Sequence, residues 1–410
     1  MIRSKIYTAL LILLIAITGC VQESADPDNA LLLRPLTAEE EILLHSSNEF
    51  SFELLRMLHQ IKPEENSLFS ALGVGNGIGM SFNLLEKKPK DELKSFLKID
   101  AVRDIEIHKA YFQLSELLNL IDYNIQYMNS NSLWVNRNME LNEYAEDKIM
   151  AYYDADLNYL DFSSDKSIKK INTWAEKRTF GKIKTIVSNL DPSDKSFIAN
   201  CLFFDINRAL PFEQIDYQDL SFTTIDGDYI NCKGIGMVSG DFNYFENEDY
   251  QIVDIPIGKK QFYLTLIMPY KLGGIHKMIT EFTPELLQNY LNQTIEINES
   301  LLIPDIEINS EIRLKSLFPN FGLTGPLRIN SDFYLNGNID ISDFIHKSHF
   351  SIGMDQYDDT QKSINPDIQP VLSEPILFNQ PFIFIVRERF TGAITFTGKM
   401  VKPVRYSSSK

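Results

Sequence analysis

Cysteine and histidine are scarce in this chain, which has three Cys and six His among 410 residues. A Cys-rich metal site or a Cys-His enzyme would need more of these residues. The nucleophile motif G-x-S-x-G is missing, and S-x-x-K begins at Ser95, Ser163 and Ser167 without its companion motifs. We therefore expect no enzymatic activity, no metal site and no cofactor.

Clusters of basic residues are missing as well. The net charge is -17, and the 39 Lys and Arg residues are interspersed with 56 Asp and Glu residues along the chain. Binding to a phosphate backbone needs clustered cations. We therefore expect no nucleic-acid partner, and the acidic balance favours solubility.

A short apolar run occurs at the beginning of the chain. Arg3 and Lys5 precede the segment from Ile6 to Ile17, which is too short to span a bilayer comfortably. The run ends in Ile-Thr-Gly-Cys at Cys20, which resembles a bacterial lipobox. Residues 1–20 are therefore predicted to be a lipoprotein signal peptide with the lipid on Cys20. The alternative is a plain secretory signal with a chance cysteine.

The segment 21–37 is polar, with Asp26 and Asp28 near its start, and we interpret it as a tether. An acidic segment after a lipidated cysteine resembles the surface-export signals of some Gram-negative lipoproteins. We therefore expect an exported protein, anchored by lipid in the bacterial outer membrane or at the cell surface. Residues 38–410 contain no linker or repeat and are predicted to form one domain.

The pattern of apolar residues favours helices in the first half and strands in the second, which is typical of an α+β domain. Predicted helices begin near Thr37 and cover 90–97, 104–121, 167–178, 275–290 and 311–318. Predicted strands cover 123–135, 195–206, 250–255, 262–267, 294–308, 344–352, 376–386 and 393–401.

Four glycines alternate at Gly73, Gly75, Gly77 and Gly79. This G-x-G-x-G spacing differs from the phosphate-binding motifs G-x-G-x-x-G and G-x-x-x-x-G-K-[ST]. Each glycine lowers helix propensity by about 1 kcal/mol. We interpret them as small faces on a tightly packed helix.

A polar segment from Gly353 to Leu377 separates two of the predicted strands and contains Pro366, Pro370 and Pro375. A loop of this length within a domain is normally functional or disordered. Because two further strands follow and must pair with upstream strands, we expect the loop to be held at both ends.

The strands around this loop resemble the serpin family. Residues 376–386, with Asn-Gln-Pro-Phe at 379–382, match its carboxy-terminal signature, and residues 396–399 with Pro403 match its closing strand. The resemblance covers about 41–406 and implies three β-sheets with about nine helices. It also implies an exposed reactive-centre loop at 353–377 and a monomer that inhibits a serine or cysteine protease. In that family the cleaved loop inserts into a sheet and traps the protease.

The resemblance assigns a role to three residues that lie far apart in the sequence. Ser70, Asn200 and His346 match the family's shutter, a hydrogen-bonded cluster below the central strands. By itself, His346 would be interpreted as a hydrogen-bonded core histidine. Gly73 stands where the family has a serine, so we expect a cluster with one hydroxyl fewer.

Alignment at equal length places the reactive-centre bond between Pro370 and Val371, with Leu372 and Ser373 as the alternative. Proline before a scissile bond suits few proteases. These positions follow from the resemblance alone.

The same alignment places the loop's hinge at Gln356, Tyr357, Asp358 and Asp359, where the family has Thr and other small residues. Alternate residues of an inserted strand face the core. A buried unpaired polar group costs about 1 to 3 kcal/mol and a charge costs more. We therefore expect insertion to be slow or absent.

Two function classes remain open: a suicide inhibitor of a serine or cysteine protease, and a surface binding or decoy lipoprotein that kept the fold without insertion. A weaker third is a surface lipoprotein that binds host or polymer ligands. Cys201 and Cys232 lie in or near apolar strands and are interpreted as small buried hydrophobes. A disulfide between them is the alternative in an exported protein.

Overall fold

The computed structural model describes residues 34–120, 125–206, 210–323, 341–352 and 374–405. Nine α-helices lie in these ranges. They are α2 (Ala38–Ile61), α3 (Ala71–Ser81), α4 (Lys87–Phe96), α5 (Asp104–Leu120), α6 (Glu143–Tyr153), α7 (Asp165–Arg178), α8 (Gly274–Glu281), α9 (Pro284–Leu291) and α10 (Leu314–Leu317), and Phe318–Phe321 adds the 3₁₀ turn η2.

The described strands form a five-stranded and a nine-stranded sheet. The smaller sheet has the order β10 (Ile306–Arg313), β11 (Asp343–Ile352), β4 (Ser196–Asp205), β2 (Gln126–Asn136), β3 (Asp156–Leu160). The larger has the order β1 (Ser67–Phe69), β14 (Ile394–Met400), β13 (Phe382–Glu388), β8 (Phe262–Pro269), β7 (Tyr250–Ile257), β6 (Tyr229–Glu246), β9 (Ile295–Pro304), β12 (Ile376–Leu377), and β5 (Phe212–Thr223) pairs with β6.

The α+β class predicted from the sequence is confirmed, but hydrogen bonding joins the described strands into two sheets instead of the expected three. The reason is the length of β6, which extends over 18 residues. It pairs with β5 and β9 along most of its length and with β7 near its end. One continuous strand therefore joins what would otherwise be two separate sheets.

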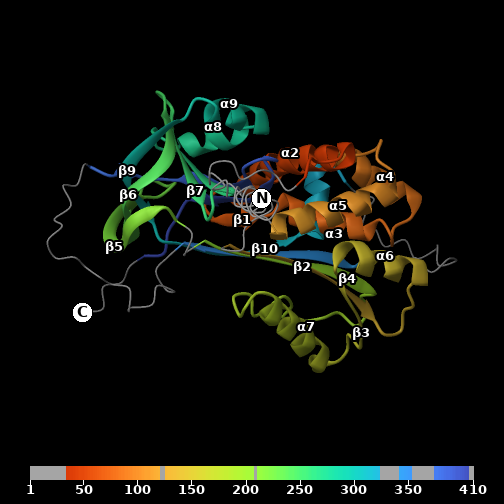
Figure 1. Cartoon of the computed structure of the whole chain (residues 1–410). Coiled ribbons are helices and arrows are strands. Elements are labelled where there is room, and N and C mark those ends of the chain that lie inside the picture. Colours follow the sequence, from red (N-terminus) through yellow and green to blue (C-terminus); the bar gives the residue numbers. More distant parts are fainter. Residues whose placement is uncertain (1–33, 121–124, 207–209, 324–340, 353–373, 406–410) are drawn as a thin grey trace, which may run out of the picture. The chain divides into compact units, whose positions relative to one another are not determined.

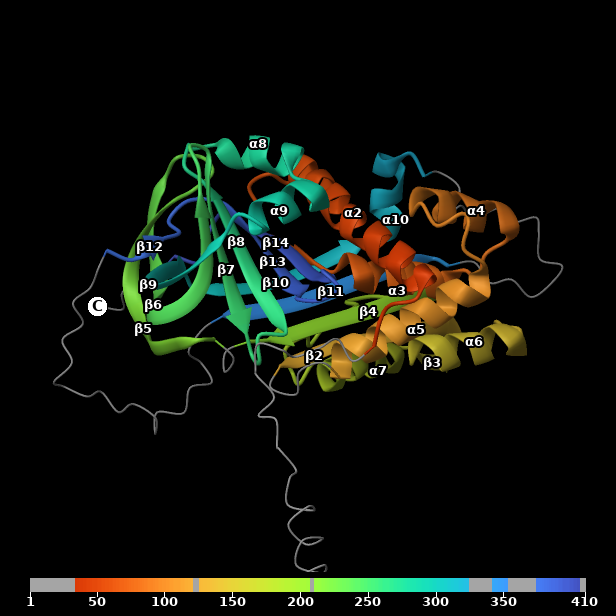
Figure 2. The same cartoon turned by 45° about the horizontal axis from the view of Figure 1, so that its top comes forward.

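Helices cover both faces of the five-stranded sheet (Figure 1). On one face, α3 contacts β4 and also β14 of the other sheet, and α2 and α5 pack beside α3. On the opposite face, α7 covers a smaller apolar cluster that includes Trp134, Phe197 and Cys201. In Figure 2, α8 and α9 lie along the nine-stranded sheet beside α2. The main core fills the space between the two sheets around α3.

The first described helix begins where its sequence predicts. Thr37 is the N-cap of α2, and its side chain and that of Glu40 form a reciprocal capping box. Arg34 donates two hydrogen bonds to the buried carboxylate of Glu40. Arg34, the first described residue, thus contacts the folded domain although it lies inside the segment predicted as the tether.

Several predicted elements differ from the structure, and the strand predicted over 294–308 is divided into β9 and β10, which lie in different sheets. The helix predicted over 275–290 is interrupted before Pro284, because Thr283 caps a second helix there and proline is well tolerated only in a first helical turn. The helix predicted from Glu311 begins at Leu314, because β10 stays paired with β11 as far as Arg313. The strand predicted over 376–386 is interrupted at 378–381, where Pro381 has no amide hydrogen for a ladder.

The alternating glycines lie on α3, as predicted, and allow close packing. An added Cβ on Gly77 would lie 2.0 Å from a ring carbon of Phe344, and one on Gly75 would lie 2.6 Å from the Tyr111 hydroxyl. A helix with larger side chains at these positions could not lie so close to β11 and α5.

Cys201 and Cys232 are both buried and unpaired. Cys201 lies on β4 in the five-stranded sheet and Cys232 lies on β6 in the other. The disulfide left open by the sequence is therefore not formed. Among the described helices, none has the length and apolar character needed to cross a bilayer.

Candidate functional site: the paired strands β4 and β11

The segment predicted as the reactive-centre loop joins the two sheets. It leaves β11 at Ile352 and enters β12 at Ile376, which pairs in parallel with Leu301 of β9. The amide of Phe378 donates to the carbonyl of Leu302 at 2.9 Å, and Gln251 Nε2 donates to the carbonyl of Leu377 at 2.7 Å. The loop is therefore held at both ends, as predicted.

Most of the residues assigned to the loop's function lie outside the described residues. These are the hinge residues Gln356, Tyr357, Asp358 and Asp359, and Pro370, Val371, Leu372 and Ser373 at the two candidate bonds. The lipidation residue Cys20 lies outside them as well. Their roles remain predictions.

β4 and β11 are parallel neighbours in the middle of the five-stranded sheet. Their register extends from Phe197 opposite Asp343 to Asp205 opposite Ser351. A strand formed by the chain after Ile352 would turn back along β11, and so would run antiparallel to both β11 and β4. The geometry therefore allows one further strand between them, provided that these two strands separate.

Below this pair the structure brings Ser70, Asn200 and His346 together. Asn200 and His346 are directly opposite in the β4–β11 register. His346 Nδ1 lies 2.7 Å from Asn200 Oδ1, and the backbone amide of Ser70 donates to His346 Nε2 at 3.1 Å. Ser70 also caps α3, because its hydroxyl accepts a hydrogen bond from the amide of Gly73 at 3.0 Å. The cluster thus ties β4, β11 and α3 to one another.

These contacts fix the protonation state of His346. Since Nε2 accepts a hydrogen bond from an amide, Nδ1 must carry the proton that is donated to Asn200. A second proton on Nε2 would face the amide hydrogen of Ser70. Burial of the ring lowers the pKa of His346 from its usual 6.5 to about 3. The imidazole is therefore neutral at physiological pH.

Two residues that sequence reasoning missed extend this cluster. Asn200 Nδ2 donates to Asn129 Oδ1 at 2.6 Å and to Asn131 Oδ1 at 2.8 Å. Both asparagines lie on β2, two residues apart and so on one face of the strand. Amide side chains at alternate positions of a predicted strand were the available signal.

The surroundings of Gly73 leave no room for a serine side chain, which the family has at this position. A Cβ there would lie 2.9 Å from Asn200 Oδ1 and 3.4 Å from the ring of His346. A larger residue at position 73 would therefore crowd this cluster, while Asn129 and Asn131 accept hydrogen bonds from Asn200.

Both faces of the β4–β11 pair carry buried side chains. Leu202 and Phe204 of β4 and Phe350 of β11 are buried in the main core. On the opposite face, the rings of Phe203 and His349 are stacked with their centroids 5.9 Å apart. Alternate residues of any strand placed here would therefore meet apolar side chains on the core side.

The chain belongs to the serpin family. The family profile, described as serpin (serine protease inhibitor), matches residues 45–403. The resemblance identified from the carboxy-terminal motifs is thus confirmed, and so is the serpin fold. Membership makes the chain a protein of the protease-inhibitor type, which agrees with the expectation that it is not an enzyme.

Relatives and solved structures match along nearly their whole length. An uncharacterized serpin-like protein of Thermococcus kodakarensis is 26% identical, with 96% of this chain and 97% of that protein covered. Human neuroserpin is 23% identical, with 88% and 92% covered. Native protease nexin-1 with heparin aligns with a TM-score of 0.76 at 15% identity, over 89% of this chain and 100% of that one. Human thyroxine-binding globulin aligns with a TM-score of 0.77 at 19% identity, over 90% and 100%.

Proposed function

We propose that this serpin is a lipid-anchored protein of the bacterial envelope that presents residues 353–377 as a bait loop to serine or cysteine proteases. We further propose that its loop inserts too slowly to trap those proteases efficiently. The observation that supports this proposal best is that β4 and β11 are paired with each other, and that Ser70, Asn200 and His346 are linked below them. The loop would have to enter between these two strands.

Insertion has an energetic cost at its first step. Separating β4 from β11 breaks their backbone ladder and the contact between His346 Nδ1 and Asn200 Oδ1. The entering hinge carries Tyr357 and Asp359, and a charge placed against Leu202, Phe204 or Phe350 lacks any partner there. Trapping is a race between insertion and deacylation, so a slow first step favours release of the protease.

A second candidate function follows from the same hinge. A serpin that does not insert its loop keeps an exposed segment that proteins can bind, and acts as a surface binding or decoy lipoprotein. The charged hinge at Asp358 and Asp359 favours this alternative. The two candidates differ in one measurable property, which is whether the cut loop becomes part of the sheet.

Thermal unfolding before and after a single cut in 353–377 measures that property. A non-target protease is used for the cut, and mass spectrometry locates it. We expect little change in Tm, because the cut loop stays outside the sheet. A rise in Tm of tens of degrees after the cut would show insertion and would contradict the proposal of slow insertion.

A hinge variant tests the physical reason. In Tyr357→Thr combined with Asp359→Ala, the two hinge positions that would face the core become small and uncharged, so we expect more protease complexes that survive denaturing electrophoresis. Asp367→Ala is the matched control, because it removes one loop charge outside the hinge. If the hinge variant and the control gave equal amounts of complex, hinge composition would not limit trapping.

The anchor is tested separately. Full-length protein with Cys20→Ser is expected to move from the membrane fraction to the soluble fraction and to lose incorporation of labelled fatty acid. An unchanged membrane fraction would contradict lipidation at Cys20.

A further inference from the structure

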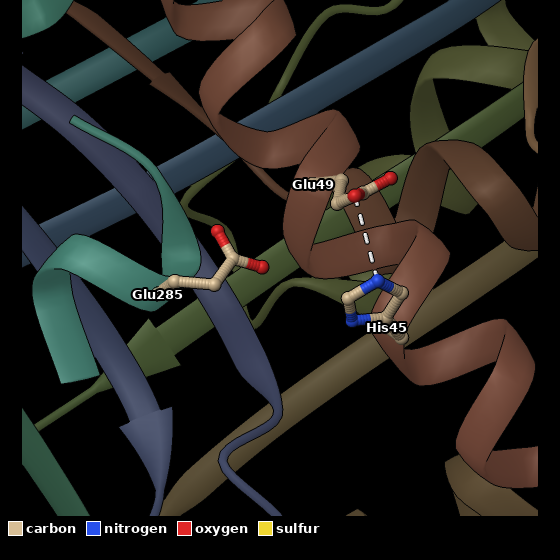
Figure 3. Close-up of side chains that lie close together, drawn as sticks. All are labelled: His45, Glu49 and Glu285. Atoms are coloured by element: carbon tan, nitrogen blue, oxygen red, sulfur yellow. Dashed lines mark ion pairs between the residues drawn. The ribbon is translucent and has the colours of Figure 1, made fainter. Parts of the chain in front are cut away.

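Three side chains with metal-binding atoms meet where α2 passes α9, away from β4 and β11. They are His45 and Glu49 of α2 and Glu285 of α9. One ligand atom of each lies within 4.8 Å of the others. In Figure 3, Glu285 faces the two α2 side chains from the other helix.

The pair on α2 has the separation that a metal ion requires. His45 and Glu49 are four residues apart and so project from the same face of the helix. His45 Nε2 lies 3.4 Å from Glu49 Oε1. A tetrahedral zinc centre with bonds of about 2.0 to 2.2 Å has ligand-to-ligand distances of about 3.4 Å. These two atoms could thus bind one ion without moving apart.

The two oxygens of Glu49 have different partners. Oε2 lies 2.6 Å from Nζ of Lys98, whereas Oε1 faces His45. The same ammonium group lies 3.7 Å from Oε1 of Glu53. This second contact holds Lys98 on the side of Glu49 Oε2. Metal sites commonly orient a ligating carboxylate through such an outer hydrogen bond. Lys98 therefore leaves Oε1 available for coordination.

The third ligand, and second carboxylate, lies at the beginning of α9. Glu285 lies in the first turn of this helix, close to its own backbone amide and to Thr283, the N-cap residue. Since Glu285 lies 236 residues after Glu49, an ion bound by both would link two helices that are distant in sequence.

We propose that His45, Glu49 and Glu285 bind one divalent transition-metal ion, with Zn²⁺ as the preferred ion and water completing its coordination. An imidazole nitrogen with two carboxylates suits zinc, whereas Ca²⁺ and Mg²⁺ prefer sites made of oxygen alone. Binding to the native state links α2 to α9 and thereby stabilises the fold.

Isothermal titration of Zn²⁺ into metal-free, full-length protein tests this proposal, with Tm followed in parallel. We expect one saturable site per chain and a Tm that rises until the site is full. His45→Ala and Glu285→Gln are each expected to lower the affinity by at least about tenfold. Because His45 is exposed, its replacement is expected to leave the metal-free Tm unchanged.

Glu41→Gln is the matched control. It removes one exposed carboxylate from α2 near His45 but outside the ligand set, so its zinc affinity is expected to equal that of the wild type. If Glu41→Gln, His45→Ala and Glu285→Gln all bound Zn²⁺ with the same affinity, the binding would be adventitious surface binding, and the proposal would be overturned. Tighter binding of Ca²⁺ than of Zn²⁺ would overturn the assignment to a transition metal.

Discussion

The ammonium group of Lys399 is buried against the imidazole of His59, with 3.0 Å between Nζ and Nδ1. Its other two hydrogens are donated to the carbonyls of Lys62 at 2.8 Å and Pro63 at 3.0 Å. His59 Nε2 in turn lies 2.8 Å from His276 Nδ1. Lys399 thereby fastens β14 to the carboxyl end of α2, where a helix dipole favours a cation.

This arrangement predicts a stability that rises at alkaline pH. Burial lowers the pKa of Lys399 to about 8, whereas an unfolded lysine has a pKa of about 10.4. Between these values the unfolded state binds more protons, so stability rises with pH by about 1.4 kcal/mol per unit from this group. Denaturant unfolding from pH 8 to 10 should show a smaller slope for Lys399→Met than for the wild type. The exposed Lys402→Met should retain the wild-type slope.

Acid should destabilise the protein through its buried histidines. Burial lowers the pKa of His346 to about 3 and the pKa values of His59, His108 and His349 to about 4. The unfolded imidazoles bind protons below about pH 6.5, so stability present above that pH is lost as pH falls toward 4.

The measurement for this prediction is denaturant unfolding at successive pH values from 7 to 4. His108→Gln should lessen the loss by about 1.4 kcal/mol per pH unit, because one such group is removed. His108 Nδ1 lies 2.7 Å from the Tyr153 hydroxyl. If the stability of this variant and that of the wild type changed equally with pH, the pKa of His108 would be the same in the folded and the unfolded state.

His346→Ala should lower the free energy of unfolding by about 2 to 4 kcal/mol. The substitution leaves the buried amide of Ser70 and the amide oxygen of Asn200 without the imidazole that pairs with them. Denaturant unfolding at pH 7 measures the change, and the exposed Ser95→Ala is a control expected to stay within about 0.5 kcal/mol of the wild type. A change below that limit for His346→Ala would contradict a structural role for the cluster.

Gly77→Ala should destabilise the fold by about 1 to 3 kcal/mol, because the new methyl group would overlap the ring of Phe344. Phe344→Leu in the same chain should recover part of that loss. A double-mutant cycle on the free energy of unfolding measures the coupling between the two sites. Strictly additive effects would show that the helix moves away from β11 instead.

The two described thiols should resist labelling in the native state. Cys201 and Cys232 are buried, and burial raises the pKa of both thiols, that of Cys232 to about 11. Since the thiolate is the reactive form, we expect a thiol reagent to modify neither residue in folded protein and both after denaturation. Peptide mass spectrometry locates the label, and modification of Cys232 in folded protein would show that β6 opens locally.

The sequence determined the parts of this protein that depend on neighbouring residues. The capping residues Thr37 and Glu40 specified the start of α2, and the carboxy-terminal motif around Asn379 identified the family. Thr283 followed by Pro284 carried the signal for a new helix, although the apolar pattern across it suggested one longer helix. Caps and periodic patterns are local, so they can be recognised without knowing the fold.

Other contacts between distant residues were decided by the tertiary structure alone. Asn129 and Asn131 complete the cluster at His346 because β2 pairs with β4 in one register, and no short-range pattern specifies that register. The contact of Glu285 with the face of α2 likewise depends on how α9 packs. Strand pairing and helix packing join residues hundreds of positions apart, and they are selected by the burial of the whole apolar core.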